Sequence, residues 1–99
     1  MSREVVLTPE ARTDLREAYL WYHEQDAAVA EQFLESVEGA MRAAANSPLH
    51  YPIRFDRFRR IVLRRFPYVI FYDHDDTAIY VSYIFHGAQN PGLLRHRLK

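Results

Sequence analysis

Four arginines stand in two adjacent pairs in the second half of the chain. Arg59-Arg60 and Arg64-Arg65 flank an apolar triplet, and His86 follows about twenty residues later. Guanidinium groups bind carboxylates and phosphates through paired hydrogen bonds, and they stay charged when partly buried. Histidine is the side chain best suited to transfer a proton near neutral pH. These residues therefore predict either a surface that binds an acidic partner or a site that stabilises a phosphate while a proton moves.

The distribution of charge along the chain points the same way. Net charge is zero, but residues 1–47 carry four arginines against nine Asp and Glu, whereas residues 48–99 carry nine Lys and Arg against four Asp. The two parts thus have net charges of −5 and +5. We expect the second part to form the contact surface for an acidic partner.

A simpler interpretation stays open for each of these residues. The arginine pairs also suit a solvated sheet edge, and a lone histidine is often only structural. Residues 73–76, DHDD, have the composition of a metal site, but they are too compact to converge as ligands, and hairpin turns favour Asp. We expect no metal ion and no other cofactor.

Length and composition limit the class of protein. The 99 residues correspond to one domain, 1–99, and the absence of cysteine excludes disulfides and thiolate metal sites. The first residues are charged where a signal peptide needs an apolar segment, and no apolar run approaches the roughly 20 residues that span a bilayer. We therefore expect a cytoplasmic protein that does not act in a membrane.

Two helices are predicted in the first half, after a short strand at residues 3–7. Thr8 can cap the first helix, with Pro9 at its first position, and the helix should end near residues 23–25. Asp26 can cap a second helix, whose apolar stripe runs to a stop at residues 46–48. Almost no chain joins the two helices, so they should form an antiparallel hairpin.

Three strands are predicted in the second half, at residues 59–65, 68–73 and 78–86. Short turns between them favour an antiparallel meander, and residues 48–58 look like a loop with at most a short extended piece. A last helical turn is predicted near the C-terminus, at residues 93–99. The resulting fold class is α+β: a two-layer β-α-α-β-β-β arrangement, with the helical hairpin packed on one face of a small, mainly antiparallel sheet.

Alternation along residues 59–65 assigns the arginines to two faces. Arg60 and Arg64 should share one face with Val62, whereas Ile61 and Leu63 should point the other way and meet the helices. The charges would then lie at an exposed edge of the sheet.

This element order, together with two stretches of sequence, resembles the RelE/ParE superfamily of bacterial toxins. The stretch TPEARTDLREAYLWY resembles the first helix of that family, and FRRIVLRRFPYVIFYDHDDTAIYVSYIFHGAQNP resembles its ParE-type signature. The resemblance covers nearly the whole chain. It implies a ParE-like toxin of a type II toxin-antitoxin system, a plasmid stabilisation protein that causes growth arrest and is held inactive by a cognate antitoxin, in a heterotetramer or a larger complex.

Two targets are known in the superfamily, and the resemblance leaves both open. ParE-type members inhibit DNA gyrase by binding, whereas RelE-type members are metal-free endoribonucleases that cut messenger RNA on the ribosome. In this chain a ribonuclease would use Arg60, Arg64, Arg65 and His86. However, Val62 and Val69 stand where that pattern has basic residues, and residues 87–89 contain no arginine. Electrostatic stabilisation usually dominates such catalysis, so the gyrase inhibitor, which is not an enzyme, is the favoured interpretation, and the ribonuclease is the alternative.

A gyrase inhibitor needs a rigid surface with arginine and aromatic anchors rather than a catalytic constellation. A third alternative is a family member that binds an antitoxin and poisons nothing. For all three alternatives, the residues expected to bind the target or the antitoxin are Arg59, Arg60, Arg64, Arg65, Tyr68, His86, Asn90, Arg95 and Arg97.

Overall fold

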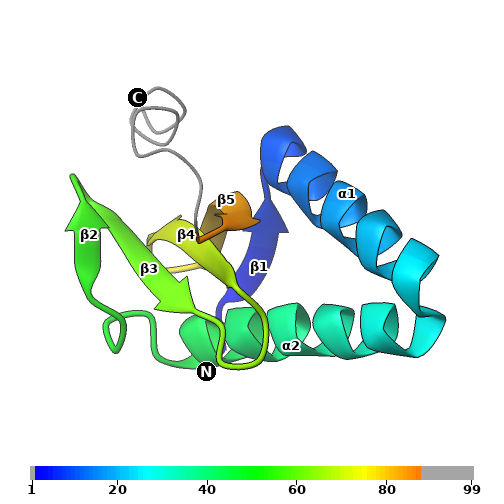
Figure 1. Cartoon of the computed structure of the whole chain (residues 1–99). Helices are drawn as coiled ribbons and strands as arrows, with labels where there is room; N and C mark the ends of the chain where they lie inside the picture. Colours follow the sequence, from blue (N-terminus) through cyan, green and yellow to red (C-terminus); the bar gives the residue numbers. More distant parts are fainter. Residues whose placement is uncertain (1, 88–99) are drawn as a thin grey trace.

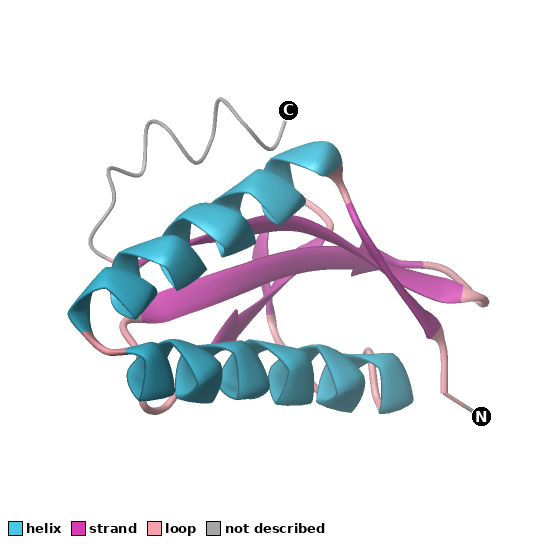
Figure 2. Ribbon diagram, turned by 90° about the vertical axis from the view of Figure 1, so that its right-hand side faces the viewer, coloured by secondary structure: helices cyan, strands magenta, loops and turns pink. Residues whose placement is uncertain are grey.

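A helical hairpin covers one face of a five-stranded sheet in the computed structural model, which describes residues 2–87 (Figures 1 and 2). The α+β fold and its two layers agree with the sequence prediction. The elements in chain order are β1 (Glu4–Leu7), α1 (Pro9–Gln25), α2 (Ala27–Asn46), β2 (Ile53–Phe55), β3 (Phe58–Val62), β4 (Tyr68–His74) and β5 (Ala78–His86). The helical turn predicted at residues 93–99 lies outside the described residues, and so do the predicted binding residues Asn90, Arg95 and Arg97. None of the helices within the described part is long and apolar enough to cross a membrane.

Both helices begin at the predicted caps. The Thr8 hydroxyl accepts a hydrogen bond from the backbone N–H of Ala11, and the Asp26 carboxylate accepts one from Ala28. Asp26 also closes α1, because its own N–H donates to the Tyr22 carbonyl at 2.8 Å. A single residue thus ends one helix and starts the next, which forces the sharp hairpin seen in Figure 2.

The strand order in the sheet is β1-β5-β4-β3-β2. Strands β3 to β5 form the predicted antiparallel meander, and β2 extends it by a further antiparallel strand. Strand β1 pairs in parallel with β5 along Glu4↔Ala78 to Leu7↔Val81. The apolar strand β5 is therefore an interior strand, with β1 on one side and β4 on the other. Ser82 is an extra residue opposite β4, a bulge that reverses which face the following side chains take.

Two buried clusters lie on the two faces of the sheet. On the helical face, Phe33 of α2 is fully buried and its ring lies 5.0 to 5.3 Å from those of Tyr22, Phe66 and Tyr68. The other face carries a separate aromatic and aliphatic cluster of Phe58, Val69, Phe71, Tyr83 and Phe85. The helical-face cluster fixes the hairpin against the strands and so sets the positions of the loops beside it.

The strand predicted at residues 59–65 ends earlier in the structure than expected. Strand β3 stops at Val62, so Arg64 and Arg65 lie in the turn before β4 rather than in a strand. Ile61 and Leu63 nevertheless pack among the helical-face residues, as alternation predicts. The region 48–58, predicted as a loop, contains β2 and the first residue of β3. Because β2 pairs with β3, the first arginine pair does not stand at the outermost edge of the sheet.

Candidate functional site

The arginines gather around one hollow, which we call the arginine pocket. It has a volume of about 580 Å³ and lies between α2, the end of β3 and the loop that precedes β2. Arg60 contributes from β3, Arg64 and Arg65 from the following turn, and Arg54 from β2. His50 and Tyr51 belong to the loop wall, and Ser36 and Ala40 of α2 form the floor. None of the described residues that line the pocket is Asp or Glu.

Two hydrogen bonds hold the loop wall of this pocket in place. The Arg59 guanidinium donates to the Tyr51 carbonyl at 2.7 Å, and the Tyr72 hydroxyl donates to the Pro48 carbonyl at 2.5 Å. Tyr72 is fully buried, and this burial raises its pKa to about 12, although the Arg59 charge opposes the shift. Arg59 therefore positions the wall through its bond to the loop.

Arg60 has a buried side-chain hydrogen-bond donor that lacks an acceptor. Its Nε is shielded from solvent and donates no hydrogen bond within the part of the chain that the structure describes. Arg65, in contrast, donates to the Gln32 side chain at 3.0 Å and lies over the Phe66 ring. A buried N–H without an acceptor costs roughly 1–3 kcal/mol, so an anionic group that reached Arg60 would remove that cost.

Tyr68 and His86 do not join the arginines. Their rings lie 5.5 Å apart at the ends of β4 and β5, beside a second hollow of about 220 Å³ that we call the α1 pocket. Burial is the main cause that raises the Tyr68 pKa. The α1 pocket is also lined by Asp14, Glu17 and the exposed Trp21 of α1. The predicted site residues in the described part thus divide between two pockets of opposite charge.

The Asp14 carboxylate has a structural role beside the α1 pocket. It accepts a hydrogen bond from the Ile84 N–H at 3.1 Å. Strand β1 ends at Leu7, so among the described residues no strand pairs with this part of β5 on that side, and Asp14 covers the edge. The contact joins residues 70 positions apart, and the sequence contains no local signal for it.

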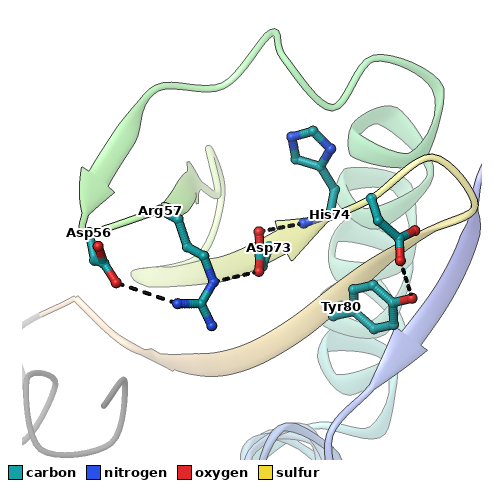
Figure 3. Close-up of polar contacts among 6 residues, drawn as sticks. Asp56, Arg57, Asp73, His74 and Tyr80 are labelled. Carbon is teal, nitrogen blue, oxygen red and sulfur yellow. Dashed lines mark hydrogen bonds and ion pairs between the residues drawn. The ribbon is translucent and has the colours of Figure 1, made fainter.

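Asp73 and Asp75 of the 73–76 turn already accept hydrogen bonds from other groups of the protein (Figure 3). Asp73 accepts from Arg57 at 2.7 Å, and Asp75 accepts from Tyr80 at 2.7 Å and from the backbone of Thr77 and Ala78. The Tyr80 bond, followed by those from Thr77 and Ala78, holds the pKa of Asp75 far below its usual value. Among residues 2–87 no group of three side chains is arranged to bind a metal ion.

The sequence predicted three arginines of the pocket, Arg60, Arg64 and Arg65, and also Arg59, which supports the pocket wall. It did not single out Arg54 and His50. Both stand in the stretch 48–58, predicted as a loop with a short extended piece. Arg54 reaches the pocket because β2 pairs with β3, whereas His50 belongs to the preceding loop, which Arg59 and Tyr72 hold in place. The sequence feature that pointed to them is that both lie in the second, basic part of the chain, residues 48–99. Asp14 of the α1 pocket had no signal beyond its place on the first helix.

Comparisons with known proteins agree with this fold. A family described as "ParE toxin of type II toxin-antitoxin system, parDE" matches residues 5–91. Among solved structures, the chromosomal ParDE toxin-antitoxin system from P. aeruginosa is similar, with a TM-score of 0.73, 16% identity, and coverage of 86% of this chain and 96% of that one.

The toxin-antitoxin complex RelBE2 from Mycobacterium tuberculosis is also similar, with a TM-score of 0.56, 24% identity, and coverage of 87% and 99%. At these identities, both structures support the fold alone. No curated protein matches the chain. The family match spans most of the sequence, and the chain therefore belongs to the ParE toxin family of type II toxin-antitoxin systems.

Proposed function

We propose that this toxin inhibits DNA gyrase by binding it, and that a cognate antitoxin neutralises it. The observation that supports binding over catalysis is the division of the site residues. Cutting RNA through its 2′-hydroxyl requires cations and a proton-transfer group around the same phosphate. Here the set predicted for a ribonuclease does not converge, because Arg60, Arg64 and Arg65 line one pocket whereas His86 lies beside the α1 pocket with Asp14 and Glu17. The histidine that does line the arginine pocket is His50, which is outside that predicted set. A binding surface needs no such convergence.

The arginine pocket supplies the anchors that this function requires. Interfaces draw most of their affinity from a few residues, and arginine is enriched among them. Arg60 and Arg64 point their charges at a pocket without a described carboxylate, so an acidic surface of the target would find unpaired donors. Asn90, Arg95 and Arg97 stay within the proposal as further contacts.

The test is supercoiling of relaxed plasmid by gyrase with purified protein titrated in. We expect inhibition by the wild-type chain and by Arg42→Ala, which removes an exposed guanidinium from the far side of α2. Inhibition should weaken at least about tenfold in the double variant Arg60→Ala, Arg64→Ala, provided that it folds. Full inhibition by a folded double variant would refute the role of these arginines.

Further assays of the same purified protein distinguish the three candidate functions. Cleavage of messenger RNA on ribosomes, without gyrase inhibition, would replace the proposal with a RelE-like ribonuclease. If folded protein inhibits neither gyrase nor translation, the chain would be a family member that binds an antitoxin without poisoning the cell. Intact transcripts during growth arrest would exclude the ribonuclease.

An apolar groove on the helical hairpin supports antitoxin binding. Leu7, Leu15 and Leu34 line this groove, which has a volume of about 460 Å³. An amphipathic helix that folds on contact would bury its apolar face there. We expect the protein encoded beside this chain to co-purify with it as a heterotetramer or larger complex, measured by light scattering. Leu15→Lys should abolish co-purification, whereas Leu20→Lys, an exposed residue of α1 outside the groove, should not.

A further inference from the structure

We propose that the arginine pocket is a binding site for a free nucleoside triphosphate, whose phosphate chain is held by the arginines while its base stacks on the loop wall. Such a ligand goes beyond the proposed function, because it gives the pocket a small-molecule occupant in addition to a protein target. Nucleotide binding is a property of the free protein, so the two proposals can fail separately.

Positive charge without a counter-charge is the first feature that calls for such a ligand. Within residues 2–87, the arginines that line the pocket form no ion pair; they are Arg54, Arg60, Arg64 and Arg65. Arg57, outside the pocket, provides the contrast, because its guanidinium binds Asp73 at 2.7 Å (Figure 3). Like charges around one hollow repel each other, and a compact anion with several negative charges would remove that repulsion.

The Arg60 side chain adds a hydrogen-bond donor that lacks an acceptor. Its Nε is shielded from solvent and donates to no group in the described part of the chain. Phosphate oxygens are strong acceptors, and guanidinium groups bind them through paired hydrogen bonds. The oxygens of a triphosphate can serve several guanidinium groups at once, so we expect Arg60 and Arg64 to anchor the phosphate chain.

The loop wall of the pocket offers aromatic surface. His50 is exposed, and its ring stands at 88° to that of Tyr51, with the ring centroids 5.0 Å apart. The hydrogen bonds that Arg59 and Tyr72 donate to this loop hold it in place without a ligand. Nucleic-acid bases stack on histidine and tyrosine rings in many proteins. The exposed ring of His50 is therefore the expected contact of the base.

The two parts of the pocket lie at different points along α2 (Figure 1). Arg65 donates to Gln32 near the N-terminal end of this helix, whereas the loop wall begins after the helix ends at Asn46. Ser36 and Ala40 form the floor between them. The volume of about 580 Å³ lies within the range of about 300–1,000 Å³ that is usual for small-molecule sites. An elongated ligand with an anionic end and a planar aromatic end fits this layout.

A free nucleotide suits the pocket better than a nucleic-acid strand. A strand carries its charges evenly along its length, and its binding sites are extended basic grooves. Here the guanidinium groups line one hollow, and the chain as a whole has no net charge. Among the described lining residues there is no Asp or Glu to hold a magnesium ion, so we expect the nucleotide to bind when magnesium is removed by a chelator.

The test is isothermal titration calorimetry of the full-length protein with ATP, in buffer that contains EDTA. The control ligands are adenosine, which lacks the phosphates, inorganic tripolyphosphate, which lacks the base, and an eight-nucleotide single-stranded RNA. Arg64→Gln and His50→Ala each change an exposed residue of the pocket, one beside the expected phosphates and one beside the expected base. Arg42→Gln and His23→Ala are the matched controls, because both replace exposed residues that do not line the pocket.

We expect ATP to bind at least about tenfold more tightly than adenosine and at least about fivefold more tightly than tripolyphosphate. Arg64→Gln should weaken the binding of ATP and of tripolyphosphate alike, by at least about fivefold, since it removes a contact to phosphate. His50→Ala should weaken ATP by at least about fivefold and leave tripolyphosphate unchanged, because only the stacking of the base is lost. Both control variants should stay within about twofold of wild type.

Circular dichroism checks that each variant folds. If Arg64→Gln does not fold, Arg54→Gln, at an exposed position of β2, serves as the second variant and should also weaken the binding of both anions.

Four results would overturn the proposal. They are no saturable binding of ATP, binding of tripolyphosphate or adenosine as tight as that of ATP, tighter binding of RNA, and an unchanged affinity for ATP in folded Arg64→Gln or His50→Ala. Binding of ATP by a protein that leaves gyrase active would support the nucleotide site and refute the proposed function. Gyrase inhibition by a protein that does not bind ATP would do the reverse.

Discussion

Replacement of Tyr72 by phenylalanine should change stability in opposite directions at neutral and at high pH. The Tyr72 hydroxyl donates to the Pro48 carbonyl, at the start of the loop that walls the arginine pocket. A buried hydrogen bond of this kind contributes about 1 kcal/mol net. At pH 7, where the tyrosine is neutral in both states, Tyr72→Phe should therefore lower the free energy of unfolding by about that amount.

At high pH the sign of the Tyr72 contribution changes. Its pKa is about 12 in the folded protein, against about 10 in an unfolded chain. The unfolded state thus loses its proton first, so stability is unaffected below about pH 10 and falls as pH rises toward 12. At pH 11 the ten-fold difference in ionisation corresponds to about 1.4 kcal/mol, which exceeds the hydrogen bond's contribution. Phenylalanine cannot ionise and avoids this loss.

Urea unfolding at pH 7 to 11.5, followed by circular dichroism, measures both effects. We expect the two stability curves to cross near pH 11, with wild type more stable below and Tyr72→Phe more stable above. Other tyrosines titrate equally in both proteins and cancel in the difference. A difference between the two proteins that stays constant over this range would show that Tyr72 ionises normally, and the proposed burial of its hydroxyl against Pro48 would be wrong.

Three further perturbations test the core, the turn and the sheet edge. Phe33→Ala should cost about 3–5 kcal/mol because it empties a fully enclosed aromatic site, and a shift in the urea midpoint of less than a quarter of that size would contradict the packing. Asp75→Asn should lower stability at pH 7. Since the folded pKa of Asp75 lies below its unfolded value, its contribution is present above about pH 4 and is lost as pH falls; the variant should lack this acid slope in unfolding measured from pH 2 to 7. Asp14→Ala should cost about 1–3 kcal/mol and speed amide hydrogen exchange at Ile84; unchanged exchange there would mean that the edge of β5 is protected by another group.

Local signals in the sequence predicted the helices and most of the meander. Thr8 and Asp26 cap the helices with side chains that belong to the same turn, so their effect can be recognised without the rest of the fold. The end of β3 could not be recognised in this way. Leu63 continues the alternation of Ile61 and is buried, but it lies in the turn, where its position depends on the helices below it.

The features that could not be predicted depend on pairing between strands that are far apart in the sequence or on a partner strand. Strand β2 has only three residues and exists because β3 supplies its partner. The parallel pairing of β1 with β5 and the bulge at Ser82 also arise from contacts far apart in the chain. The arginine pocket shows both cases, since its paired arginines were evident from the sequence, whereas Arg54 reaches it through β2 and His50 through the loop that Arg59 and Tyr72 hold.

Pairing of the first strand with the last has a consequence for the time at which the toxin can become active in a cell. Glu4 pairs with Ala78, so β1 waits until a further 74 residues have been made. At synthesis rates of about 5–20 residues per second, that delay is about 4–15 seconds. Until β5 emerges, β1 has no partner and β4 lacks one of its two neighbours, so the nascent chain cannot complete its sheet. The order of the strands thus delays completion of the fold until nearly the whole chain has been translated.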